Sequence, residues 1–228
     1  MTNEGRAQAL MLVAQYVHAR RLDHPVRVAV DGVTASGKTT LADELSNELT
    51  KLGRSVHRLS MDGFHHPRAR RYKQGRHSAL GYYEDAYDFS SLAQHVLIPL
   101  GPGGDFHYRR AIIDLATDTP VDEPALQLQQ SAVLVVDGTF LQKSEIVDLW
   151  DTTIFVHTSF DVARRRGVAR DAAALGGITQ ADHAFKVRYH AASQLYLDEA
   201  SPAERASLVF DNDDLDQPSV RMVHPESP

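Results

Sequence analysis

The chain has 228 residues, 43% of them hydrophobic and 24% charged, a balance that excludes a disordered chain and allows one large domain. It has no cysteine, which excludes disulfides, thiolate metal sites and cysteine nucleophiles. Its net charge of −6 gives no general attraction to polyanions, so we expect no nucleic-acid partner.

The first part of the chain predicts a helix, a strand, a second helix and a second strand. Apolar residues at helical spacing predict an N-terminal helix within 1–21, clear from residue 4 onward. The run VRVAVD is short and β-branched and predicts a buried strand. Four leucines then mark one face of a helix that Gly53 is well placed to end. The second strand is SVHRLSMD, residues 55–62.

The rest of the chain continues this alternation after a long irregular loop at 62–90, a length that is uncommon unless functional. Strands are expected at 131–138, 152–159 and 206–212, and helices at 91–99, about 160–171 and about 180–199. Residues 106–124 predict a hairpin or an irregular arm, and the tail 213–228 is expected to be loose. Apolar strands alternating with helices predict an α/β fold, a three-layer sandwich with a mostly parallel central sheet and helices on both faces.

The glycine loop after the first strand carries the chemistry. Residues 32–39 match G-x-x-x-x-G-K-[ST] in full, in the strand-to-helix context that this motif requires. In such a loop successive backbone N–H groups point at phosphate oxygens, and the helix N-terminus adds its positive dipole end. The predicted nucleotide-binding residues are Gly32, Val33, Thr34, Ala35, Ser36, Gly37, Lys38, Thr39 and Thr40. We expect Lys38 to reach the β- and γ-phosphates and Thr39 to offer its hydroxyl to Mg²⁺.

Three classes of protein use such a cradle: GTPase switches, motors or other ATPases, and small-molecule kinases. The N-K-x-D motif that reads guanine in GTPases is missing from this chain. Oligomeric ATPases are usually longer and supply an arginine in trans, which we cannot identify here. The sequence therefore favours a small-molecule kinase that uses ATP and Mg²⁺, within a single domain, 1–228.

Two aspartates are expected where buried strands end, at the edge of the sheet where ligands gather. Asp62 leads into the loop at 62–90, which we interpret as the acceptor loop, so we predict that it orients and deprotonates the acceptor hydroxyl. Asp137 closes the strand expected beside the cradle and is predicted to hold Mg²⁺ or its waters. A helix cap or a turn is the alternative role for each.

Cationic residues are predicted at two places around the phosphates. Arg166 and Arg170 share one face of a helix and are predicted to close over the phosphates as a lid that would stabilise charge in the transition state. Between residues 64 and 77 a basic loop carries five Lys or Arg and no acidic residue, and either meets an anionic ligand or is simply solvated. His65 in this region is expected to contact substrate or solvent rather than zinc.

Several of these segments together resemble the uridine kinase, phosphoribulokinase and pantothenate kinase group. They are GVTASGKTT, LSMDGFHHP, DAYDF, VLVVDG and the arginine-rich helix ending GVARD, within roughly residues 25–212. The resemblance implies that Asp62 is the base, that Asp137 helps to hold Mg²⁺, and that Asp85, with Asp88 as the competitor, binds ribose hydroxyls. It also implies a mobile lid at 164–179. Tyr189 is expected in the core.

One segment departs from the uridine kinases. Their arm reads P-V-Y-D-F and then a polar residue and a histidine, and its tyrosine and histidine hold the pyrimidine, whereas residues 111–118 here contain neither aromatic. Uridine or cytidine is the first acceptor expected, with another nucleoside, pantothenate or a sugar as alternatives. A nucleotide-binding regulator without a small-molecule acceptor is the alternative of another class. The choice between ATP and GTP and the existence of a homo-oligomer stay open.

The sequence also bears on location. Its start, MTNEGRAQAL, is not a signal peptide, and no apolar run approaches the roughly 18 residues of a membrane span. We therefore expect a cytoplasmic protein with no membrane partner.

Overall fold

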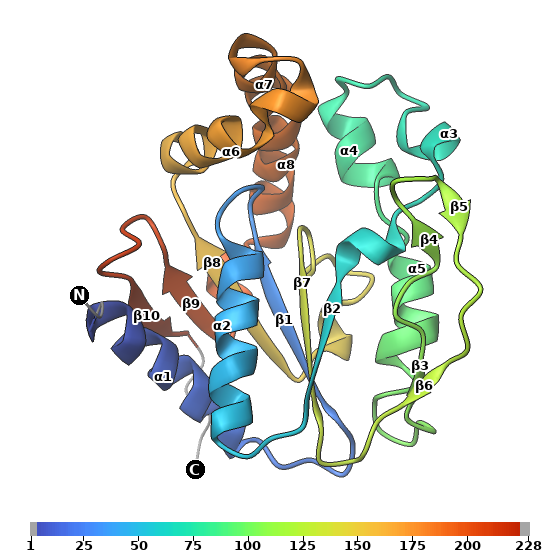
Figure 1. Ribbon diagram of the computed structural model, residues 1–228, viewed down its shortest axis with the longest axis vertical. Coiled ribbons are helices and arrows are strands. Elements are labelled where there is room, and N and C mark those ends of the chain that lie inside the picture. Colours follow the sequence, from blue (N-terminus) through green and yellow to red (C-terminus); the bar gives the residue numbers. More distant parts are fainter. Residues whose placement is uncertain (1–3, 224–228) are drawn as a thin grey trace.

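The computed structural model describes residues 4–223 and has a central six-stranded sheet between two layers of helices (Figure 1). The strand order is β10-β9-β8-β1-β7-β2. The bounds are β1 Val26–Gly32, β2 Val56–Ser60, β7 Val133–Gly138, β8 Thr152–His157, β9 Leu208–Asp211 and β10 Ser219–Met222. β1 pairs in parallel with β7 and β8, and the outer pairs β2·β7 and β8·β9 are also parallel. The predicted α/β fold with a mostly parallel sheet is confirmed.

The tail at 213–228 was expected to be loose, and this is wrong for Ser219–Met222, which form the strand β10. β10 pairs antiparallel with β9, from Ser219 opposite Asp211 to Met222 opposite Leu208. A turn over 213–218 reverses the chain, so β10 adds the one antiparallel edge to a sheet whose other pairs are parallel. The sequence missed this strand because it is short, exposed and polar. Residues 224–228 of the predicted tail, like residues 1–3 of the predicted N-terminal helix, lie outside the described residues.

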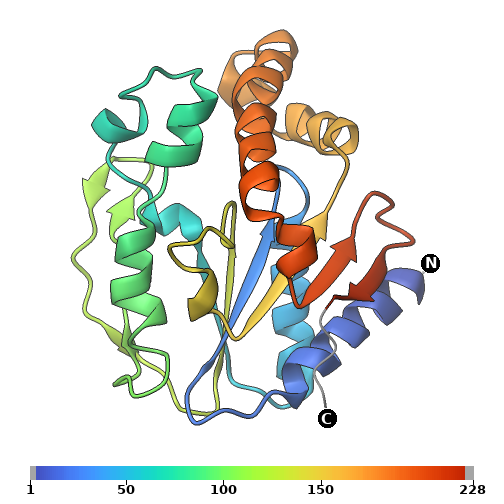
Figure 2. The ribbon, with the colours of Figure 1, turned by 180° about the vertical axis from the view of Figure 1, so that it is seen from behind.

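Two apolar cores lie on opposite faces of the sheet because successive side chains of a strand point to opposite faces. On one face Val28 and Val30 of β1 pack under the helices α1, Glu4–Ala19, and α2, Lys38–Lys51. On the other face Ala29 of β1 packs with the tyrosines of 82–87 and with Tyr196. Figure 1 shows α1 and α2 in front of the sheet, and Figure 2 shows the opposite layer.

Short helices occupy regions where the sequence predicted a loop or an unbroken helix. The segment 62–90 contains η1 Met61–Phe64, α3 Arg68–Arg71, α4 Ala79–Asp85 and the start of α5 Phe89–Leu92, which continues as η2 Ala93–Leu97. The predicted arm forms two small antiparallel pairs, β3 His107–Tyr108 with β6 Leu126–Gln127 and β4 Ile113–Asp114 with β5 Thr119–Pro120. η3, Val147–Leu149, precedes β8.

The helices after β8 frame the top edge of the sheet. They are α6 Phe160–Leu175, α7 Ile178–Ala184, η4 Phe185–His190, α8 Ala191–Ala200 and α9 Pro202–Arg205. The glycine pair Gly176 and Gly177 separates α6 from α7, and both have positive φ. Figure 1 shows α6 and α7 on one side of the loop between β1 and α2, with α3 and α4 on the other. Among the helices of residues 4–223, none has both the length and the apolar character that a membrane span needs.

Candidate active site

The phosphate cradle predicted at residues 32–40 joins β1 to α2 in the expected strand-to-helix context. Gly37 is the N-cap of α2 with φ of 97°, and a Cβ there would lie 2.5 Å from the Asn212 amide nitrogen. Gly32 leaves a similarly small space, because a Cβ would lie 2.6 Å from the Val156 carbonyl oxygen. Both glycines are therefore required for this backbone path.

The polar side chains of the cradle leave hydrogen-bonding capacity for a ligand. Within residues 4–223, the buried hydroxyls of Thr34 and Ser36 have no hydrogen-bond partner. The Lys38 ammonium donates to the Val33 carbonyl oxygen at 2.7 Å, and burial lowers the pKa of Lys38 to about 8. Buried donors without strong acceptors fit the phosphate chain of a nucleotide, which supplies several anionic oxygens.

The two residues predicted to hold Mg²⁺ are in contact. Thr39 Oγ1 donates to Asp137 Oδ2 at 2.6 Å, and Asp137 Oδ1 accepts from the Arg58 guanidinium at 2.9 Å. In the described part of the chain no group of three or more His, Asp or Glu is arranged to hold a metal. A hydroxyl and one carboxylate fit Mg²⁺, because this ion keeps several waters and takes further oxygens from bound phosphates.

A cavity of about 330 Å³ lies in front of the cradle and brings the predicted catalytic residues together. Lys38, Thr39, Asp137 and Asp62 all line it. Asp62 lies in η1, two residues beyond β2, so the prediction that the strand itself ends at Asp62 is wrong. The reason is a local turn in which the Asp62 amide donates to Ser60 Oγ at 3.3 Å.

His65 also lines this cavity, as predicted for a substrate contact, and it is tied to Asp62. His65 Nε2 lies 3.5 Å from Asp62 Oδ1, and this interaction is the main reason why the pKa of the Asp62 carboxyl lies below its usual range. The His65 ring stacks on Tyr87 with centroids 4.2 Å apart, and its Nδ1 contacts the Ala86 carbonyl oxygen at 2.8 Å. The imidazole is therefore fixed, and the Asp62 carboxylate, 69% exposed, faces the open cavity.

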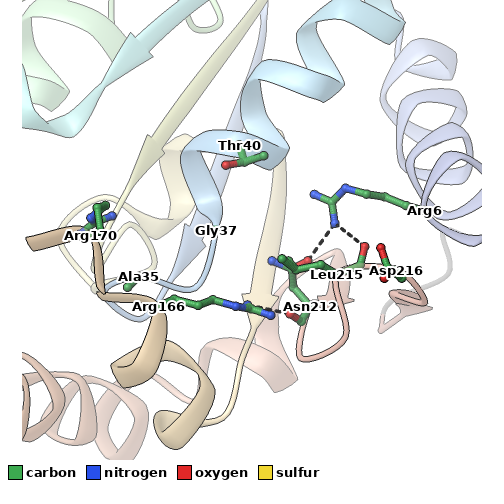
Figure 3. Close-up of a pocket in the computed structure, with 9 residues that line it drawn as sticks. All are labelled: Arg6, Ala35, Gly37, Thr40, Arg166, Arg170, Asn212, Leu215 and Asp216. Carbon is green, nitrogen blue, oxygen red and sulfur yellow. Dashed lines mark hydrogen bonds between the residues drawn. The ribbon is translucent and has the colours of Figure 1, made fainter. Parts of the chain in front are cut away.

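A second cavity of about 390 Å³ lies on the other side of the cradle, as Figure 3 shows. It is lined by Arg6, Ala35, Gly37, Thr40, Arg166, Arg170, Asn212, Leu215 and Asp216. Asn212 connects its walls, because its amide nitrogen donates to the Ser36 carbonyl oxygen at 2.8 Å and its amide oxygen accepts from Arg6 at 3.0 Å. The turn between β9 and β10 thus completes a pocket beside the phosphate cradle.

The arginine pair of α6 borders the cavities, since Arg170 lines both and Arg166 lines the second. Arg166 donates to the carbonyl oxygens of Asn212 and Asp213, each at 2.9 Å, and so joins α6 to the turn after β9. Arg170 is bound to the Asp171 carboxylate at 2.7 Å and lines both cavities. Two guanidinium groups thus flank the space in which a nucleotide's phosphates would end.

Comparison with known proteins adds a family to this geometry. Residues 27–194, more than half of the chain, match the model of the phosphoribulokinase/uridine kinase family. The chain belongs to this family. It is 30% identical to uridine-cytidine kinase B of Dictyostelium discoideum, and the alignment covers 67% of this chain and 61% of that protein. It is 25% identical to a uridine kinase of Lactiplantibacillus plantarum over 64% of this chain and 68% of the relative.

A solved structure agrees with this membership. The structure of a possible uridine kinase from Bacillus stearothermophilus has a TM-score of 0.71 and 25% identity, and it covers 90% of this chain and 98% of that one. Membership of the phosphoribulokinase/uridine kinase family indicates a phosphotransferase that acts on an alcohol acceptor. It also places the sheet and cradle in the P-loop kinase fold.

Two residues expected at the acceptor of this uridine kinase family member do not line the cavity in front of the cradle. Asp88 is the N-cap of α5, accepting from the Ser91 amide at 2.9 Å, and it lies 3.5 Å from His66. Asp85 at the end of α4 accepts from the Gln74 side chain at 2.8 Å. Neither carboxylate lines the cavity that holds Asp62, and their contact with the acceptor stays a prediction.

Residues beyond the predicted site set form much of the acceptor side. Within the described chain the cavity wall includes Tyr72, Tyr82, Tyr87, Leu115, Arg71, Arg188 and Tyr189. Tyr189 also packs against the core, as predicted, so it serves both surfaces. The tyrosines of YYEDAY gave a usable signal, because an aromatic cluster beside a candidate base often lines a ligand cavity. Arg71 belongs to the predicted basic loop, but its 2.9 Å ion pair with Asp118 of the distant arm depends on the fold and had no signal in the sequence.

A buried carboxylate supports the cradle from below. Asp31, the residue before Gly32, has no exposed surface and accepts hydrogen bonds from Tyr196 Oη, Gln142 Nε2 and the Leu141 amide. Burial raises the pKa of its carboxyl. Because Tyr196 belongs to α8, this contact ties the helix after the predicted lid to the strand that enters the cradle.

We expect Tyr196→Phe to lower the free energy of unfolding by about 1–3 kcal/mol, because a buried carboxyl loses a hydrogen-bond donor. The change should appear as a lower midpoint in urea denaturation with an unchanged slope. Tyr16→Phe is the matched control, since the Tyr16 hydroxyl makes no hydrogen bond within residues 4–223 and the Arg20 guanidinium stacks on its ring. Equal midpoints for Tyr196→Phe and the unchanged protein would contradict the role of this network.

Proposed function

We propose that the protein is a kinase that transfers the γ-phosphoryl group of ATP directly to a hydroxyl of a small molecule. One observation carries this proposal: Asp62 and Lys38 line the same cavity of about 330 Å³, which Asp137 also lines. A nucleotide bound in the cradle would present its terminal phosphate to that cavity, and an alcohol opposite it would lie within reach of the carboxylate.

Each residue of the site has a separate role in the proposed phosphoryl transfer. The amides of residues 32–39 bind and orient the phosphates, and Lys38 places a positive charge beside the transferred group. Asp62, ionised at neutral pH because its pKa is lowered, accepts the hydrogen bond of the acceptor hydroxyl and then its proton. Thr39 and Asp137 are the residues that would hold Mg²⁺, which when bound neutralises charge on the phosphates.

The arginines of α6 are proposed to stabilise the phosphoryl group during transfer. Arg170 lines both cavities, and Arg166 connects α6 to the turn beside the nucleotide side. We further propose that the segment 164–179 acts as a lid, with Gly176 and Gly177 as the hinge, because residues with positive φ and no side chain allow a change of direction between α6 and α7. Closure would exclude water from the phosphates.

The acceptor is proposed from the substrates for which the two relatives are named. Uridine and cytidine are the first candidates, because the two relatives described above are a uridine-cytidine kinase and a uridine kinase. The arm contributes Leu115 to the cavity instead of an aromatic or an imidazole. Another nucleoside, pantothenate or a sugar is therefore an alternative acceptor on the same machinery.

A screen for ADP release tests this function. The full chain is incubated with ATP, Mg²⁺ and, in turn, uridine, cytidine, other nucleosides, pantothenate and simple sugars. We expect at least one alcohol to stimulate ADP release well above the rate without acceptor, with a phosphorylated product visible by mass spectrometry. Slow hydrolysis that no alcohol accelerates would reject the kinase and favour the nucleotide-binding regulator.

A further inference from the structure

A third cavity, of about 540 Å³, adjoins the acceptor cavity between the basic loop and the tip of the predicted lid. Its walls include Arg76 and His77 from the loop and Thr179 and His183 from α7. Tyr72, Arg188 and Tyr189 line both this chamber and the cavity that holds Asp62. Arg188 therefore belongs to the wall between the chamber under α7 and the cavity that holds Asp62, and it borders both.

The chamber has positive charge without an acidic partner. The described residues of its wall include two arginines and two histidines, and no aspartate or glutamate. Other arginines nearby are paired: Arg71 with Asp118, Arg164 with Asp182 and Arg170 with Asp171, at 2.6–2.9 Å. Arg76 and Arg188 have no carboxylate within 4.0 Å among residues 4–223. The missing acid distinguishes this chamber from an ordinary surface ion-pair network.

Arg188 is held in place with its charge unsatisfied. Its guanidinium lies over the rings of Tyr72, Tyr82 and Tyr189, at 5.2, 5.0 and 5.4 Å from their centroids. Its Nε is buried and has no hydrogen-bond partner in the described part of the chain. Stacking on aromatic rings stabilises a guanidinium but leaves its planar N–H edge free for a bidentate anion.

We propose that the acceptor is an anionic alcohol, whose carboxylate or phosphate binds at Arg188 and Arg76 while its hydroxyl meets Asp62. Tyr82 lines the same cavity as Asp62, and the Arg188 guanidinium lies 5.0 Å from the centroid of its ring. This inference rests on the proposed phosphoryl transfer and narrows its substrate class away from neutral nucleosides. An anion is favoured because it pairs a partly desolvated cation that a neutral acceptor would leave without a partner.

Matched pairs of acceptors test the charge. Each pair differs in one anionic group: pantothenate and pantothenol, glycerate and glycerol, ribose 5-phosphate and ribose, with uridine and cytidine added. We expect kcat/KM for an anionic member to exceed that of its neutral partner by about 10- to 100-fold, the effect of a charge-assisted hydrogen bond. Carboxylates and phosphates are distinguished by which pair responds. Equal use of both members, or better use of uridine or cytidine, overturns the inference and leaves the kinase function intact.

The substitution Arg188→Gln tests whether the preference for an anionic acceptor arises at Arg188. We expect KM for the preferred anionic acceptor to rise about 10- to 100-fold, with KM for ATP unchanged and partial recovery in Arg188→Lys. Arg76→Gln should act in the same direction more weakly, because Arg76 is more exposed. Arg205→Gln is the matched control. Arg205 is exposed at the end of α9, which precedes β9, and it lines neither cavity. An equal loss with neutral and anionic acceptors would mark Arg188 as structural and overturn the inference.

A binding measurement keeps the outcome clear if no alcohol accepts phosphate. Pantothenate, glycerate and ribose 5-phosphate are then titrated calorimetrically into the full chain. Binding that Arg188→Gln abolishes supports the anion site even though the kinase proposal has failed. The absence of any such binding overturns the site as well.

Discussion

Asp62→Asn is expected to lower kcat by about 10² to 10⁴-fold while ATP binds as before, since this is the usual contribution of a general base. Asparagine keeps the shape of the side chain but cannot take the hydroxyl proton. Asp62 faces the acceptor cavity, and within residues 4–223 its carboxylate makes no hydrogen bond to the cradle, so phosphate binding should not depend on it. The measurement is steady-state turnover with the best acceptor, together with calorimetric titration of ATP.

The control for this prediction replaces a different exposed aspartate, which pairs with an arginine, whereas Asp62 pairs with His65. Asp122 lies in the arm, 3.7 Å from Arg109, and its side chain is 99% exposed. Asp122→Asn should leave kcat unchanged. If Asp62→Asn keeps full turnover, then Asp62 is not the base, and the hydroxyl must be oriented by another group of the same cavity.

Much of the fold and the cradle could be predicted from sequence because their signals are local. A β-branched apolar run, two glycines at fixed spacing, and a lysine and threonine at the start of a leucine-faced helix all act within one strand-loop-helix unit. The contact between Thr39 and Asp137 also followed, since the carboxyl ends of neighbouring parallel strands lie at one edge. Local chemistry and sheet topology together determine these positions.

The acceptor side was less predictable because it is built from distant segments. Whether the aspartates near residues 85–88 face the ligand depends on how α4 meets α5, and the Asp88 carboxylate is used as a helix cap instead. Arg188 belongs to η4 and becomes a cavity residue only because α4 and η4 pack together around Tyr82. No spacing along the chain encodes such a contact. β10 was missed for the related reason that pairing with β9, rather than its own sequence, makes it a strand.

Asp31 shows how the same tertiary contacts connect the two halves of the site. Its carboxylate sits beneath the cradle and is bound by Tyr196 of α8, which continues from η4 and therefore from Arg188. The helix that carries the acceptor-side cation is thus anchored to the strand that carries the phosphate cradle. A displacement of α8 would alter both sides, so acceptor and nucleotide are expected to be bound by one connected framework.

Lys38→Met is expected to weaken ATP binding by about 10- to 100-fold and to lower turnover with it, because a buried charge-assisted contact to phosphate is lost. A second result follows from the pKa of about 8 in the ligand-free protein. Phosphate oxygens favour the protonated amine, so above that pH the complex holds a proton that the free protein lacks. ATP affinity should therefore fall as the pH rises through 8, by up to about tenfold per pH unit.

Calorimetry in two buffers of different ionisation enthalpy measures both the affinity and the proton uptake. Lys51→Met is the matched control, because Lys51 ends the same helix, with its side chain 69% exposed and paired with Glu48. The control should keep the affinity and its pH dependence, whereas Lys38→Met should lose both. If the pH dependence survives in Lys38→Met, the proton is taken up elsewhere and the lysine does not meet the phosphates as the geometry requires.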